Sequence, residues 1–320
     1  MGLIMDSSVK ERIHAPSGVT PVWFLKLVGR SSLVFDVLRR GLGQKRMWRE
    51  GKSAGRNPDE TGRVVSSALP DEILWDDGDV LFVRHGQLIH SFARAQEFSL
   101  LRRYKHFLKK PVLDLGCGDG SFASALFKEV DYGVDIDDRA LRIAGEYGIY
   151  NVIIKSGERT IPLDDGRVCS IFSNSVLEHL NEMESILSES NRVLVHGGIL
   201  MFTVPVKQYE RDLLKYFGRS ASIRVNRESF HRNLLEPDEW KRLLHKVGFE
   251  VVSVQPYQPD WFTFWYRMLR LFGKRGLPAI FPGIADLVWK MYGAELVEMV
   301  RKSISETTIG GNILVVARKR

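Results

Sequence analysis

The stretch Val112–Phe127, VLDLGCGDGSFASALF, decides the fold. An apolar run ends at Asp114, glycines follow at alternate positions, and a helical pattern then begins, which is typical of a strand that leads into a tight turn. Glycine suits such a turn because it adopts positive φ and, without a Cβ, lets a ligand press against the backbone. The spacing disfavours a dinucleotide site, since Gly120 comes one position early and Ser121 stands where that fingerprint requires glycine.

The charge of this turn favours a cationic ligand. A loop that cradles a pyrophosphate normally lacks acids and directs a helix N-terminus at the anion, whereas this loop carries Asp114 and Asp119. Two carboxylates suit a ligand with an ammonium and a sulfonium, and S-adenosylmethionine has both. Asp135 follows the next apolar run, so we expect it to cap the neighbouring strand, with its carboxylate free to accept from both ribose hydroxyls.

Residues 111–249, together with a last strand at Asn312–Ala317, resemble the class I S-adenosylmethionine-dependent methyltransferases. The family pattern Asp-x-Gly-x-Gly-x-Gly is matched by Asp114, Gly116, Gly118 and Gly120, and its acid after the second strand by Asp135. The resemblance implies an α/β fold: a Rossmann-like, doubly wound, mostly parallel seven-stranded sheet with a helical N-terminal extension and substrate-cap insertions. It also implies S-adenosyl-L-methionine as the cofactor.

The predicted cofactor contacts lie in the glycine turn and at the ends of the strands. They are Asp114, Gly116, Cys117, Gly118, Gly120, Asp135, Ile136, Glu158, Ser173 and Asn174. Similar enzymes place an acid near the adenine amino group where this chain has Gly157, so the adjacent Glu158 is the candidate there. No metal ligand set is predicted.

Three residues are candidates for the chemistry. Methyl transfer is an in-line displacement that depends mainly on alignment, but an alcohol acceptor must also lose a proton to a base. Glu178 and His179 resemble the family's Leu-Glu-His run, and His231 lies in an insertion where similar enzymes often have a histidine. His179 has the alternative of packing under the sheet and bonding to backbone, so His231 is the preferred base.

Composition limits the class of protein. The chain has 320 residues, 44% of them hydrophobic, which suffices for one α/β core with additions. The net charge of +7 is concentrated between Pro21 and Arg56, so the remaining chain is balanced and a nucleic-acid-binding core is not supported. The two cysteines lie in predicted core elements, which excludes a disulfide framework. We expect a cytoplasmic protein without signal peptide or membrane span.

The predicted organisation has four parts. Residues 1–20 are disordered, and residues 21–110 hold a basic amphipathic helix, a polar linker and a lid helix at Phe92–Leu108, from which Arg94 and Tyr104 could face the cofactor. Residues 111–256 form the core, with an insertion at 207–235 of local charge +4, and residues 257–320 hold an aromatic helical segment and the last strand. The basic helix, in residues 21–56, either docks on an anionic membrane surface or packs against the core or a second subunit.

These features leave three functions open. The first is O-methylation of a small or lipid-linked acceptor, such as a sugar of a glycolipid or polysaccharide. The second is C- or O-methylation of an apolar ring such as a quinone precursor, which the aromatic segment would accommodate. The third is a non-catalytic S-adenosylmethionine-binding scaffold at a membrane. A homodimer and peripheral membrane attachment are further expectations.

Overall fold

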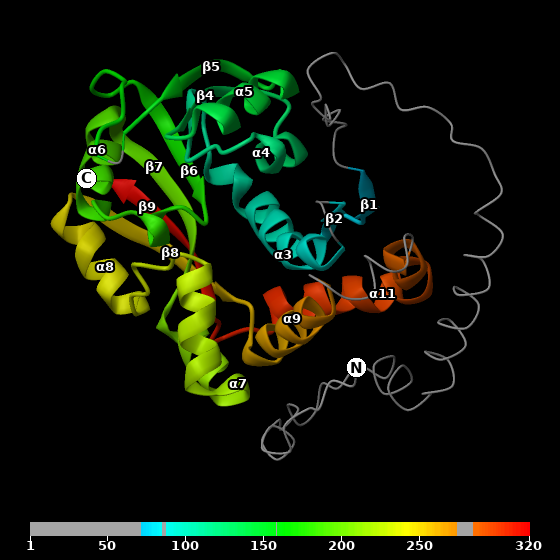
Figure 1. Ribbon diagram of the computed structural model, residues 1–320. Coiled ribbons are helices and arrows are strands. Elements are labelled where there is room, and N and C mark those ends of the chain that lie inside the picture. The colour runs from blue at the N-terminus through cyan, green and yellow to red at the C-terminus, as the bar shows by residue number, and fades with distance from the viewer. Residues whose placement is uncertain (1–71, 85–87, 158, 274–283) are drawn as a thin grey trace, which may run out of the picture.

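The computed structural model describes residues 72–84, 88–157, 159–273 and 284–320 (Figure 1). The predicted disordered segment, the basic amphipathic helix of residues 21–56 and the candidate Glu158 lie outside these residues. Within them, the fold consists of one central sheet, helices on both of its faces, and additions at one end.

The central sheet has seven strands in the order β5-β4-β3-β6-β7-β9-β8. They are β3 (Val112–Leu115), β4 (Val130–Asp135), β5 (Tyr150–Lys155), β6 (Val168–Asn174), β7 (Leu194–Pro205), β8 (Phe249–Tyr257) and β9 (Asn312–Lys319). The strands β5, β4, β3, β6 and β7 pair in parallel, and β9 lies antiparallel between β7 and β8. The predicted mostly parallel, Rossmann-like sheet is therefore confirmed.

Core helices begin and end at signals visible in the sequence. They are α4 (Ser121–Leu126), α5 (Asp138–Tyr147), α6 (Met183–Val193) and α8 (Pro237–Lys246). The Asp137 carboxylate accepts from two backbone N–H groups at the start of α5, and α8 begins with a proline inside a capping box. Helix α4 ends at Leu126, because Phe127 is already extended where the chain turns toward β4.

Alternation along the strands divides the core between the two faces of the sheet. In β7, Met201 belongs to the cluster that includes residues of α3 (Leu88–Tyr104), α9 (Asp260–Gly273) and α11 (Ile284–Ser305). Its neighbours Leu200 and Phe202 pack instead with residues of α6 and α8. The sheet is thus covered on both faces, as is typical of a mostly parallel sheet.

The additions surround one end of the sheet. A hairpin of β1 (Ile73–Asp76) and β2 (Leu81–Val83) packs on α3, which ends in a short 3₁₀ turn at Lys105–Phe107. The insertion forms α7 (Lys207–Glu228), broken at Gly218, and the aromatic segment forms α9. Figure 1 shows α7, α9 and α11 gathered at the bottom of the view, away from α5.

The strand order creates a topological switch point. From β3 the chain continues to β4 and β5 on one side of the sheet, and β6 and β7 lie on the other side. Ligands of open α/β sheets bind outside the carboxyl ends of the strands at such a point. The glycine turn after β3 and Asn174 at the end of β6 therefore meet at the edge where a ligand is expected.

Candidate active site

The glycine turn is fixed to the neighbouring strand by backbone hydrogen bonds. The N–H groups of Gly116 and Cys117 both donate to the carbonyl of Val134, at 2.9 and 3.0 Å. Gly116 has φ +75°, and a Cβ built there would lie 2.5 Å from the side chain of Val176. Gly118 has φ +55°, yet nothing lies within 4 Å of its Cβ position. Gly116 is thus required by packing, whereas Gly118 leaves backbone open to a ligand.

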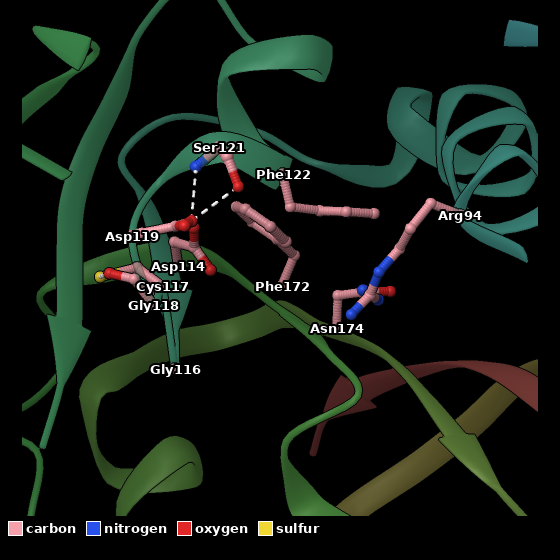
Figure 2. Close-up of a pocket in the computed structure, with 10 residues that line it drawn as sticks. All are labelled: Arg94, Asp114, Gly116, Cys117, Gly118, Asp119, Ser121, Phe122, Phe172 and Asn174. Carbon is pink, nitrogen blue, oxygen red and sulfur yellow. Dashed lines mark hydrogen bonds between the residues drawn. The ribbon is translucent and has the colours of Figure 1, made fainter. Parts of the chain in front are cut away.

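Two acids flank this open backbone. Asp114 is buried and accepts a 2.7 Å hydrogen bond from the hydroxyl of Tyr150, and its burial raises the pKa of this carboxyl to about 7. Asp119 accepts from both the N–H and the hydroxyl of Ser121, which fixes the start of α4 (Figure 2). The turn therefore places two carboxyl groups beside the open backbone.

Asp135 supports the turn directly. One carboxylate oxygen accepts from the N–H of Gly118 at 2.8 Å, and the other accepts from the N–H of Asp137 at 2.9 Å. The carboxylate is therefore not without protein partners, but each oxygen keeps a lone pair for a further donor, so the predicted contact with the ribose hydroxyls stays a prediction. Ile136 follows with 52% of its surface exposed, so an apolar side chain lies open beside Asp135.

The turn forms one wall of a cavity, called the cofactor cavity below. Five of the predicted cofactor contacts line it, namely Asp114, Gly116, Cys117, Gly118 and Asn174. Figure 2 shows Phe122 and Phe172 between the turn and Asn174, and Arg94 reaching from α3 toward Asn174. Burial raises the pKa of the Cys117 thiol, so the cysteine stays neutral in this wall.

Four predicted contacts among the described residues do not line the cofactor cavity, namely Asp135 and Ile136, described above, and Gly120 and Ser173. Gly120 is the residue before α4, and its Cβ position lies 3.1 Å from Ala144 and Tyr150, so it serves close packing. Ser173 is buried, and its hydroxyl donates to the carbonyl of Leu115 at 2.8 Å, which ties β6 to β3. Both residues shape the site from behind the lining.

A second cavity, called the acceptor cavity below, adjoins the first and shares Arg94 with it. Its lining includes all three candidates for the chemistry, Glu178, His179 and His231. It also includes Glu97 from α3 and Tyr266 and Arg267 from α9. The insertion and the aromatic segment therefore both contribute to this cavity.

The two histidines face each other with ring centroids 5.8 Å apart. His231 Nδ1 lies 3.1 Å from Oδ1 of Asn226, and burial lowers the pKa of His231 to about 4. An amide oxygen only accepts, so Nδ1 of this neutral ring carries the proton and Nε2 keeps its lone pair. His179 is more exposed, and its Nδ1 lies 3.2 Å from the carbonyl of Phe230, which matches the backbone contact considered above.

Glu178 is the most buried of the three. Only 2% of its surface is exposed, and one of its carboxylate oxygens has no hydrogen-bond partner among the described residues. The other lies 3.6 Å from Nε2 of His179. Burial raises the pKa of Glu178 to about 8, so the carboxyl is mostly protonated at neutral pH.

The lid helix contributes a network that joins the two cavities. Arg94 pairs with Glu97, and Glu97 accepts from the side-chain amide of Asn174 at 2.9 Å. Arg94 lines the cofactor cavity, which was the less favoured of its two interpretations, whereas the hydroxyl of Tyr104 lies 3.4 Å from the side chain of Gln255. The sequence indicated Arg94 through its place on the lid but gave no sign of Glu97.

Comparisons with known proteins agree with this geometry. Residues 86–254 match a family model described as a methyltransferase domain. A probable S-adenosylmethionine-dependent methyltransferase of Mycolicibacterium smegmatis is 29% identical over 44% of this chain and 52% of its own length. A ubiquinone biosynthesis O-methyltransferase of Thiobacillus denitrificans is 24% identical over 44% of this chain and 65% of its own length. The chain thus spans about half to two thirds of these relatives.

The structure of a geranyl diphosphate methyltransferase, in complex with geranyl diphosphate and sinefungin, shares the fold. It has a TM-score of 0.50 and 16% identity, and the match covers 73% of this chain and 81% of that protein. The family model covers more than half of the chain and includes the glycine turn, the lid helix and the end of β6. The chain therefore belongs to the class I S-adenosylmethionine-dependent methyltransferase family, whose cofactor is S-adenosylmethionine.

Proposed function

We propose that this chain transfers a methyl group from S-adenosylmethionine to a hydroxyl oxygen of a small or lipid-linked acceptor, with a sugar of a glycolipid or polysaccharide as the preferred class. The observation that carries the proposal is the position of the acceptor cavity. It adjoins the cofactor cavity at Arg94 and holds Glu178, His179 and His231.

The residues of the cofactor cavity fit S-adenosylmethionine. Open backbone at Gly118 admits close approach, and Asp114 and Asp119 suit a ligand with cationic ends. Asp135 and Ile136 would hold the ribose and adenine, and Asn174 the methionine portion. When bound, the cofactor supplies an electrophilic methyl carbon attached to a positively charged sulfur.

The acceptor cavity supplies a base for an alcohol. His231 is neutral, and its Nε2 lone pair can take the hydroxyl proton as the acceptor oxygen bonds to the methyl carbon and the carbon–sulfur electron pair returns to sulfur. The Asn226 contact fixes the tautomer, as a buried polar partner commonly does for catalytic histidines. Because Glu178 is mostly protonated at neutral pH, it is the weaker candidate for a base there.

A ring acceptor is the second candidate. Tyr209 and Tyr266 line the acceptor cavity and offer aromatic faces to a flat ring. The relative from Thiobacillus denitrificans carries a name that points to a quinone precursor. O-methylation of a ring would share one step with the first candidate, deprotonation of a hydroxyl beside His231.

The test is incorporation of radiolabelled methyl groups. Purified protein is incubated with labelled S-adenosylmethionine and separated lipid, glycan and small-molecule fractions of its host. We expect label in the glycan or glycolipid fraction, with His231→Gln reducing it and His196→Gln, an exposed histidine of β7, leaving it unchanged. Label in a quinone fraction would favour the ring acceptor. No label in any fraction would overturn the proposal and favour the non-catalytic scaffold.

We further propose attachment to a membrane surface, a homodimer and a cytoplasmic location. Among the described residues, no helix combines the length and apolar character needed to cross a bilayer. Attachment through residues 21–56 is tested by sedimentation with vesicles that contain anionic lipid, compared with the chain lacking residues 1–56.

A further inference from the structure

Arg267 of α9 is a buried cation that lacks a carboxylate partner in the described part of the chain. Only 9% of its surface is exposed, and it lines the acceptor cavity. One terminal nitrogen donates to the hydroxyl of Tyr209, and the guanidinium carbon lies 5.6 Å from the ring centroids of both Tyr209 and Tyr266. Its Nε has no hydrogen-bond partner among the described residues.

The aromatic contacts hold the guanidinium without neutralising it. Rings attract a cation through their faces, but a buried charge is normally paired because its desolvation is costly. The other charges of the cavity do not supply the partner. Glu97 already pairs with Arg94, and Glu178 is mostly protonated at neutral pH. Because His231 is neutral, the cavity keeps one uncompensated positive charge.

We infer that Arg267 binds an oxyanion of the methyl acceptor, either a carboxylate or a phosphate. The inference rests on the proposed function, since it takes this cavity as the acceptor site. A guanidinium presents paired N–H donors in a plane that matches both kinds of oxyanion. Within the proposed class, the acceptor is then an acidic or phosphorylated sugar rather than a neutral one. For a ring acceptor, the same reasoning requires a carboxylate or phosphate group on the ring.

The position of Arg267 makes it a specificity-determining residue. It shares the cavity with His231, whose pKa it helps to lower, so the oxyanion and the reacting hydroxyl would occupy one site. When Arg267 holds the acceptor at its anionic end, the hydroxyl of the acceptor can lie beside His231. A neutral analogue of the same shape would leave the guanidinium buried and unpaired, and it should therefore be rejected.

The experiment uses the full chain saturated with S-adenosylhomocysteine, with inorganic phosphate and acetate as separate probes. Thermal unfolding is followed at constant ionic strength, with chloride as the reference salt. We expect a saturable rise in melting temperature with phosphate, acetate or both, and the stronger probe identifies the oxyanion. Arg267→Met should weaken this binding at least tenfold, and Arg267→Lys should weaken it less. The control Lys215→Met removes an exposed cation that pairs with Asp260, and it should leave the response unchanged.

Retained binding of S-adenosylhomocysteine shows that a variant is folded. If Arg267→Met no longer binds S-adenosylhomocysteine, the wild-type protein is studied by NMR instead. The nitrogen signal of Arg267 Nε is assigned by its absence from Arg267→Lys. This signal must shift saturably with phosphate or acetate. A wild-type response no larger than that to chloride, or an undiminished response in Arg267→Met, would overturn the inference. Failure of methyl transfer with anion binding intact would instead refute the proposed function alone.

Discussion

The hydroxyl of Tyr150, on β5, donates a 2.7 Å hydrogen bond to Oδ2 of Asp114, at the end of β3 and on the other side of β4. Burial raises the pKa of this carboxyl to about 7, and the bond from Tyr150 opposes that rise. The charge of Asp114 therefore depends on a residue two strands away. In the proposed function a cationic end of the cofactor lies beside Asp114, so cofactor affinity should depend on the charge of this carboxyl.

Cofactor affinity should depend on pH through Asp114. Protonation below about pH 7 removes the negative charge, so affinity for S-adenosylhomocysteine should rise with pH and level off above about 7. Tyr150→Phe removes the bond that favours the charged form and should move this midpoint to higher pH. Titration calorimetry across pH measures both. A pH-independent affinity in wild type would contradict the assignment, and Asp114→Asn should show weak, pH-independent binding.

Two alanine substitutions in the glycine turn should fail for different reasons. In Gly116→Ala the new Cβ meets Val176 at 2.5 Å and the backbone is strained, so we expect a loss of stability of about 1–3 kcal/mol. In Gly118→Ala the new Cβ contacts no other atom, and only the positive φ is unfavourable. Stability should therefore fall by roughly 1 kcal/mol, while cofactor affinity falls more. Chemical denaturation and calorimetry separate the two effects. If the two variants lost cofactor affinity in the same proportion to their loss of stability, Gly118 would not be the open wall of the cofactor cavity.

Glu178 should make stability fall as pH rises. The pKa of its carboxyl is raised in the folded state from 4.5 to about 8, so its favourable contribution is complete below pH 4.5 and is lost as pH rises through about 8. Glu178→Gln removes this dependence. The difference in unfolding free energy between wild type and variant should therefore decline from pH 4.5 to about 8. A flat difference would show that the carboxyl titrates normally.

His231→Gln should impair turnover without weakening cofactor binding. Loss of a general base costs about 10²- to 10⁴-fold in rate, and His231 lies in the acceptor cavity rather than the cofactor cavity. Single-turnover methyl transfer to the identified acceptor measures the rate, and calorimetry with S-adenosylhomocysteine measures binding. The control is His196→Gln, which should behave as wild type. A rate within a factor of about three of wild type would exclude His231 as the base.

The sequence predicts the sheet and the glycine turn because their signals are local. Each core strand is a short apolar run, and the turn is recognised by alternate glycines between a strand and a helix. The roles of Asp135 and Ser173 depend on tertiary hydrogen bonds to Gly118 and Leu115, which no spacing reveals. The sequence correctly placed both residues at strand ends, but it did not show that their side-chain oxygens form hydrogen bonds with backbone groups.

The acceptor cavity was less predictable. Its candidates Glu178, His179 and His231 came from resemblance to the family, and the structure brings them together. The aromatic segment gave no indication of which face of α9 would point inward. Packing decides which face points inward. The rings of Phe262 and of Phe92 in α3 stack with their centroids 4.4 Å apart, while Arg267 faces the cavity. A buried arginine is not expected from composition, since arginines are mostly exposed.

Titration calorimetry tests most directly whether the turn after β3 receives S-adenosylmethionine. S-Adenosylmethionine should bind saturably, Asp135→Ala should abolish the heat, and Asp138→Ala, an exposed acid paired with Lys155, should preserve it. NADH should give no binding heat. Binding of NADH together with no response to S-adenosylmethionine would contradict the account.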